Sequence, residues 1–412
     1  MYNVLKTKLT GLKNPIHDFS QRLTEFNLEE RNIKEFSAMI SREMKKLDFD
    51  EVIQDPAGNI IGIIKGYDTQ EDLVLISHMD FSAFHGMESF YSYQPELDML
   101  NFKAGIISSI YAGGLMKRAL VPLKGNLVVC CVPRNESCGV GIKYLFDTYL
   151  RQRQKNIKGV ILCEPTDFNI NLGHKGKMEY EIVVKGKIGK DDFFEQRGIN
   201  MLGTMFPLIN ELEKYSQTLP RDFTLGPSSL RIKDVSYSGY GSTYQPQEDL
   251  RECRVVVDRT YAPEEEEGMI LNKAKSIAKS VYQEEPEVMI KTAVATSKVK
   301  TLAGTEVVAE KEYKPWRMEG HHPFVLSSLQ VLQENGFDAN VGYWKRIITE
   351  GSYTCGELQL PTIGFGVGSE EMLALANPAI SVDDLVKAVY GQTLISQRNL
   401  GMPTFGWCED EI

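Results

Sequence analysis

The chain has 412 residues, of which 42% are apolar and 25% charged, and these ordinary globular values exclude a disordered or fibrous protein. Its 46 basic and 56 acidic side chains give a net charge of −10, which argues against a nucleic-acid partner because phosphate backbones are also negative. No apolar run reaches the roughly 18–20 residues that cross a bilayer, and the first 19 residues lack the apolar stretch of a secretory signal. The seven cysteines include no Cys-x-x-Cys pair, so we expect reduced thiols, a cytoplasmic location and no membrane contact.

The N-terminal part of the chain predicts a layered α/β fold. A helix is expected over residues 27–47, because Asn27 and Glu30 have capping-box spacing and apolar residues recur behind them at helical intervals. A hairpin follows, with strands at 51–53 and 60–64 around a turn at 55–59. Short runs that are apolar on both faces then alternate with helical segments, at 73–76, 127–132, 160–163 and 362–365. Parallel strands that are covered by helices on both faces need such runs.

The middle of the chain has a different pattern and predicts an inserted α+β domain. Residues 178–185 alternate apolar and charged side chains, as in a strand with one wet face, and further strands are expected at 229–235 and 253–258. A helix is expected after Pro263, with the acidic residues 264–267 in its first turn, where the helix dipole favours them. Helices at 323–334 and 381–396 return to the first pattern. We therefore expect residues 1–175 and 294–412 to form one α/β domain and residues 176–293 to form the insertion.

Polar residues stand where three of the apolar runs end. These endings are Ser77-His78-Met79-Asp80, Asn135-Glu136 and Glu164-Pro165-Thr166-Asp167. Because the carboxyl ends of parallel strands border one crevice, we expect the three groups to converge. An imidazole and carboxylates are metal ligands, so these residues predict a metal site made by His78, Glu136 and Glu164. Asp80 is expected to orient the ligands of this site without binding the ion itself. Each signal taken singly is weak, because a lone histidine at a strand end is more often structural and a glutamate there usually makes a surface salt bridge, but their placement on successive strand ends favours a joint site.

These residues resemble those of the co-catalytic di-zinc deacylases and carboxypeptidases, the family of acetylornithine deacetylase, succinyl-diaminopimelate desuccinylase and glutamate carboxypeptidase. Within it the chain looks closest to the hydrolases linked to selenium metabolism. The resemblance covers almost the whole chain and rests on the three strand endings, on Gly173-His174-Lys175-Gly176 and on Gly364-Phe365-Gly366-Val367-Gly368. It implies a zinc-peptidase-like mixed sheet between helices, with the insertion acting as a lid domain that dimerises. It also implies zinc as the cofactor, with His78, Glu136 and Glu164 as ligands.

The resemblance also shows four departures from the family pattern. The bridging Asp is replaced by Asn101, the general base by Asn135, the distal His ligand by Ala374 and the oxyanion-stabilising lid His by Lys190. An amide lacks the charge that offsets the repulsion of two cations, and it takes no proton from a metal-bound water. We expect zero or one zinc ion per chain.

Several nearby residues stand close enough in the sequence to compensate for these losses. They are Asp98, His85, His321, His322, Glu370 and Glu371, although none has the expected spacing. His174 matches a stretch where the family's chain enters the lid, so we interpret it as structural. The sequence has no Gly-x-Ser-x-Gly elbow, His-Glu-x-x-His motif or phosphate loop that would indicate another chemistry.

Two functions follow from this pattern. We favour a catalytically inactive homologue that acts as a binding, structural or regulatory subunit, with a small molecule as a further ligand. Its partner would be a second copy of the chain, or an active homologue, bound through the lid. The alternative is an active hydrolase of amide bonds in small acylated amino acids or ureido compounds. That enzyme would use one zinc ion at His78, Glu136 and Glu164 with an unrecognised base.

Overall fold

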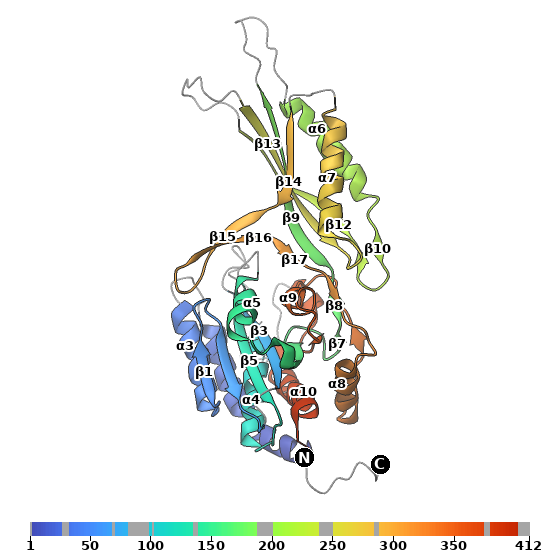
Figure 1. Cartoon of the computed structure of the whole chain (residues 1–412). Coiled ribbons are helices and arrows are strands. Elements are labelled where there is room, and N and C mark those ends of the chain that lie inside the picture. Colours follow the sequence, from blue (N-terminus) through green and yellow to red (C-terminus); the bar gives the residue numbers. More distant parts are fainter. Residues whose placement is uncertain are drawn as a thin grey trace, which may run out of the picture. The chain divides into compact units, whose positions relative to one another are not determined.

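Figure 1 shows the computed structural model, which describes residues 2–26, 33–67, 71–80, 99–100, 103–134, 139–187, 201–238, 250–283, 288–374 and 380–402. The chain divides into two compact units. Unit 1 comprises Met1–His174, Val299–Val307 and Trp316–Ile412, and unit 2 comprises Lys175–Lys298 and Val308–Pro315. The division expected from the sequence falls at 175/176 and 293/294. That the units fold as separate domains, and that the second acts as a lid, stays a prediction. Within the described residues, no helix is long and apolar enough to cross a membrane.

Unit 1 is built on an eight-stranded mixed sheet in the order β1-β2-β5-β3-β6-β20-β7-β19. The strands are β1 (Glu51–Gln54), β2 (Ile60–Ile64), β3 (Asp72–Asp80), β5 (Asn126–Arg134), β6 (Ile157–Leu162), β7 (Ile170–Asn171), β19 (Val341–Gly342) and β20 (Thr362–Gly364). Strand β3 pairs in parallel with both β5 and β6, and β20 pairs in parallel with β6. The four apolar runs are therefore neighbours in one sheet, and the α/β fold class is confirmed.

Two apolar cores cover this sheet because alternate residues of its strands point to opposite faces. Leu73 and Leu75 of β3 belong to one core, and Val74 and Ile76 belong to the other. The first core is completed by α1 (Tyr2–Thr10), α2 (Lys13–Glu25), α3 (Ile33–Lys46), α4 (Ala104–Arg118), α8 (Pro323–Glu334) and α10 (Val382–Leu400). The second core is completed by α5 (Val140–Tyr144), the π-helical turn Leu145–Tyr149 and the chain around Trp344.

Short pairs of strands complete unit 1. Strand β8 (Gly173–His174) pairs with β18 (Trp316–Arg317), and β4 (Met99–Leu100) pairs with β21 (Ile380–Ser381). Strand β15 (Thr296–Lys300) pairs with β16 (Glu306–Glu310), and each of these two strands has residues in both units. Two one-turn elements lie near the sheet edge: α9 (Gly351–Thr354) and the 3-10 turn η6 (Glu371–Ala374).

The local predictions for unit 1 hold with two corrections. The hairpin β1–β2 forms as expected, and the Asp55 carboxylate closes its turn by accepting from the backbone N–H groups of Gly58 and Asn59, both at 2.9 Å. Helix α3 begins at Ile33, so the predicted cap at Asn27 and Glu30 lies outside the described residues. Helices α1 and α2 were not predicted, because their apolar positions are diluted by lysines and a proline. Helix α10 is capped by Ser381, whose hydroxyl accepts from the Asp384 N–H at 3.0 Å.

Unit 2 contains an antiparallel sheet in the order β12-β13-β9-β14, with β17 also on β9. Its elements are β9 (Gly176–Lys187), α6 (Met201–Ser216), β12 (Ser229–Ser238), β13 (Leu250–Tyr261), α7 (Glu267–Val281), β14 (Met289–Val294) and β17 (Glu312–Tyr313), with β10 (Arg221–Asp222) and β11 (Gly226–Pro227) as a small hairpin. Helices α6 and α7 share a core with the sheet (Figure 1). The prediction that residues 264–267 lie in the first turn of a helix is wrong for three of them. Helix α7 begins at Glu267, so Glu264 to Glu266 precede it.

Candidate metal centre

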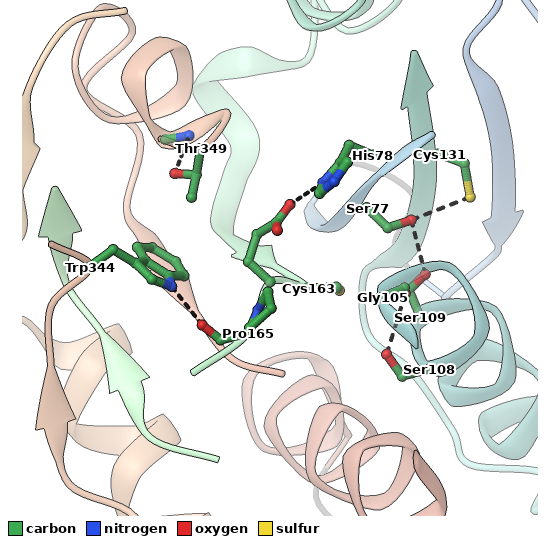
Figure 2. Close-up of polar contacts among 12 residues, drawn as sticks. Ser77, His78, Gly105, Ser108, Ser109, Cys131, Cys163, Pro165, Trp344 and Thr349 are labelled. Carbon is green, nitrogen blue, oxygen red and sulfur yellow. Dashed lines mark hydrogen bonds and ion pairs between the residues drawn. The ribbon is translucent and has the colours of Figure 1, made fainter. Parts of the chain in front are cut away.

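His78 and Glu164 lie together at one edge of the unit 1 sheet. His78 stands near the carboxyl end of β3, and Glu164 follows β6 by two residues. Because β3 and β6 are parallel neighbours, their ends meet at the same edge. The Nδ1 atom of His78 is in hydrogen-bond contact with Oε1 of Glu164 (Figure 2). The Glu164 residue is 2% exposed, so its carboxylate is almost wholly removed from water.

Glu350 joins this pair, although the sequence analysis did not select it. It directly precedes α9, and ligand atoms of His78, Glu164 and Glu350 all lie within 4.8 Å of one another. Glu350 is 6% exposed. Two buried carboxylates this close repel each other unless a proton or a cation lies between them. An imidazole nitrogen and carboxylate oxygens are donors that zinc accepts, so this set of residues fits a divalent ion.

A small cavity of about 40 Å³ adjoins His78 and Glu164. A water needs roughly 10–15 Å³ of such space, so the cavity has room for an ion or a few waters. Its remaining wall is largely apolar and includes Ala104, Val367, Met372 and Ile380. Gly105 allows α4 to approach this wall, because a Cβ atom at position 105 would lie 2.2 Å from the backbone oxygen of Cys163. The cavity therefore combines two potential metal ligands, His78 and Glu164, with a largely apolar wall.

Two buried thiols lie in the strands and strand ends near the site but are not members of the cluster of His78, Glu164 and Glu350. Burial raises the pKa of Cys131 to about 12 and raises the pKa of Cys163 well above its ordinary value. Ser77 lies 3.4 Å from Cys131 Sγ and 3.4 Å from Ser109 Oγ, contacts that place its hydroxyl in the interior (Figure 2).

The other predicted site residues are placed only in part. Asn101, Asn135, Glu136 and Lys190, together with Asp98 and His85, lie outside the described residues. Asp80 ends β3 and Ala374 ends η6, and the structure describes the backbone of each but not the side chain. The assignment of Glu136 as a ligand and of Asp80 as an orienting group stays a prediction.

Three of the residues proposed to compensate, Glu370, His321 and His322, make other contacts. The Glu370 carboxylate accepts hydrogen bonds of 2.8–3.0 Å from the backbone N–H groups of Lys345, Arg346 and Ile347, so it closes a loop. His321 is exposed and contacts Glu319 at 2.9 Å, and His322 caps α8 by accepting from the Phe324 N–H. His174 is buried among Trp316 and Trp344, in agreement with the structural role expected for it.

A mixed sheet between helices, with an imidazole and a carboxylate at the ends of neighbouring parallel strands and a second carboxylate beside them, is the architecture of a metallohydrolase. The chain belongs to the peptidase family M20/M25/M40, whose family model matches residues 101–395. It is 27% identical over 358 residues to the uncharacterized protein YgeY of Escherichia coli strain K12, a match that covers 80% of this chain and 81% of YgeY.

Several solved structures share the fold of this chain. The di-peptidase Dug1p of Saccharomyces cerevisiae superposes with a TM-score of 0.69 at 10% identity, over 97% of this chain and 98% of that one. The YXEP protein of Bacillus subtilis, described as a dinuclear metal binding peptidase of the M20 family, superposes with a TM-score of 0.63 at 14% identity, over 95% and 98%. At these identities the comparison establishes the fold alone.

Proposed function

We propose that this chain is a catalytically inactive member of the M20 family that retains one metal site and acts as a binding, structural or regulatory subunit. Among the family's branches, the hydrolases linked to selenium metabolism stay the expected nearest group. The chain's own residues would hold one ion at His78, Glu136 and Glu164, and the family's second ion would lack its bridging Asp and its distal His, which are Asn101 and Ala374 here.

The observation that carries this proposal is Asn135. In the family pattern the residue before the glutamate ligand is the general base, and here it is an amide. An ion bound at His78 and Glu164 would polarise a water molecule, but Asn135 has no lone pair basic enough to remove that water's proton. A positioned base contributes about 10²–10⁴ to the rate. Asn101, Ala374 and Lys190 remove a bridge, a ligand and an oxyanion donor as well.

The experiment measures turnover and metal content on the same full-length protein. Zinc-loaded protein is incubated with a panel of N-acylated amino acids, dipeptides and ureido acids, and product is quantified by mass spectrometry. We expect no metal-dependent turnover, and we expect His78→Ala to lower the metal content without changing any residual rate. A turnover of about 1 s⁻¹ or faster, within the ordinary range of enzymes, that is lost in His78→Ala would refute the proposal.

A second function is favoured by one observation, the position of Glu350. A buried carboxylate within 4.8 Å of the His78 and Glu164 ligand atoms could serve as the unrecognised base of a one-zinc amide hydrolase. This function predicts that Glu350→Gln abolishes turnover while zinc stays bound. The inactive function predicts no turnover to abolish.

The proposed partner is a second copy of this chain or an active homologue, bound through unit 2. A subunit without chemistry of its own needs a partner on which to act. The antiparallel sheet of unit 2 ends in β12, and an edge strand is a common site for pairing across a two-fold axis.

A further inference from the structure

We propose that Glu350 is a ligand of the same metal ion as His78 and Glu164, and that His174 is the residue that positions it. This inference rests on the metal-binding part of the proposed function. It adds Glu350, which the family pattern does not supply, to the expected family ligands His78 and Glu164, so that the ligands come from β3, from the loop after β6 and from the turn before α9.

The local charge supports a shared ion. The Glu164 and Glu350 residues are 2% and 6% exposed, so neither carboxylate is solvated enough to tolerate its neighbour without compensation. His78 contacts Glu164 and supplies at most one positive charge, and only when it is protonated. A divalent ion compensates both carboxylates and leaves the imidazole neutral, which is the form that binds metals. These three ligands leave a fourth position for the expected ligand Glu136 or for a water molecule.

The turn that carries Glu350 is fixed by hydrogen bonds on both sides of it. The backbone N–H of Thr349 donates to Nε2 of His174 at 2.9 Å. The backbone N–H of Gly351 donates to the Thr349 hydroxyl at 3.2 Å, and this hydroxyl lies 2.9 Å from the same His174 nitrogen. His174 is 1% exposed, so these contacts are shielded from water. The imidazole thus holds the backbone from which the Glu350 side chain extends.

Aromatic packing prevents the turn from shifting. A Cβ atom at position 351 would lie 2.3 Å from the Trp316 indole, so only a glycine lets the chain pass this ring. The His174 ring meets Trp316 edge-on, with ring centroids 5.7 Å apart. Residues that do not bind the ion but fix the orientation of a ligand typically contribute 10- to 100-fold to the metal affinity, which is lost when they are removed.

The test is isothermal titration of the metal-free full-length protein with Zn²⁺ alone. We expect one ion per chain for the wild type and an affinity about 100-fold or more lower for Glu350→Gln, since a direct ligand contributes at least as much as the groups behind it. The matched control is Glu357→Gln, a nearby carboxylate that contacts Lys143 at 3.8 Å outside the cluster; its affinity should stay within about threefold. Each variant must show a cooperative thermal transition without metal. If Glu350→Gln does not, Glu350→Asp, which withdraws the carboxylate by one methylene, is used with the same expectation.

The role of His174 is tested by two variants, one that removes the hydrogen-bond acceptor and one that replaces it with another acceptor atom. His174→Ala should lower the Zn²⁺ affinity by about 10- to 100-fold. His174→Gln should restore most of it, because the glutamine oxygen can accept the Thr349 N–H in place of Nε2. If His174 is purely structural, both variants should have a lower unfolding temperature, and the Zn²⁺ affinity of the folded protein should be unchanged. That result would overturn the proposal that His174 positions Glu350.

The outcomes separate this inference from the proposed function. The inference fails if Glu350→Gln binds Zn²⁺ as tightly as the wild type, or if the wild type binds no Zn²⁺. In either case catalytic inactivity is still decided by the turnover assay. If the wild type turns over substrate and Glu350→Gln still loses the ion, the inference stands and the proposed function fails.

Discussion

The indole nitrogen of Trp344 donates a hydrogen bond of 2.6 Å to the carbonyl oxygen of Pro165, the residue that follows Glu164 (Figure 2). Trp344 is completely buried and packs against Trp316 and His174. His174 in turn holds Thr349, which precedes Glu350. One aromatic cluster therefore supports the backbone beside both carboxylates of the candidate metal centre.

Trp344→Phe should cost more stability than Trp316→Phe. Both substitutions remove a similar volume from the second core, and each opens a similar cavity. Trp316 is 2% exposed, and within the described residues its indole nitrogen has no hydrogen-bond partner. Only Trp344→Phe thus leaves a buried carbonyl without its donor, which should add about 1–2 kcal/mol to the loss. Urea denaturation of the two variants measures the difference, and equal losses would show that the hydrogen bond contributes nothing.

The part of the candidate metal centre that follows from sheet topology could be predicted from the sequence. His78 and Glu164 were selected because they follow apolar strands, and parallel neighbours place such ends at one edge. Glu350 has no such signal, since it precedes a one-turn helix, and its position depends on His174 and Trp316, which are distant in the sequence. Glu370 shows the opposite error: its position in the sequence suggested a replacement ligand, yet its carboxylate binds three backbone N–H groups.

The stability contribution of Cys131 should depend on pH in the alkaline range. Burial raises the pKa of this thiol from 9.0 to about 12. Between those values the folded state keeps a proton that the unfolded state has lost, so stability falls as pH rises. The free energy of unfolding of the wild type relative to Cys131→Ala should be constant between about pH 6 and 8 and should fall by roughly 1 kcal/mol by about pH 10. A difference that stays constant to pH 10 would contradict the buried thiol's raised pKa.

Val235→Lys should weaken the proposed dimer. Val235 lies on β12, which is at one edge of the unit 2 sheet, and it is 41% exposed. A lysine on an edge strand discourages pairing with another strand, because its charge must be buried or displaced. Light scattering at micromolar concentration should show a dimer for the wild type and mostly monomer for the variant. Met289→Lys, at a 58% exposed position on β14 at the opposite edge of the sheet, is the control, and it should leave the mass unchanged because the proposed dimer pairs through β12. A wild type that is monomeric, alone and with an active homologue, would refute the proposed partner.

Restoring the family's missing groups should restore the second metal ion. Asn101→Asp returns the charged bridge, Ala374→His returns the distal ligand and Asn135→Glu returns the base, so the triple variant regains every group that the resemblance assigns to the second ion and to its water. We expect two zinc ions per chain by mass spectrometry of the metal content, against one in the parent protein.

Asn135→Glu alone is the control, and it should leave the metal content at one because a base adds no ligand. Weak hydrolysis of acylated amino acids by the triple variant is also expected, at a rate limited by Lys190, which still occupies the position of the oxyanion donor. A triple variant that folds like the parent but binds a single ion would show that the loss of the second site extends beyond these three residues.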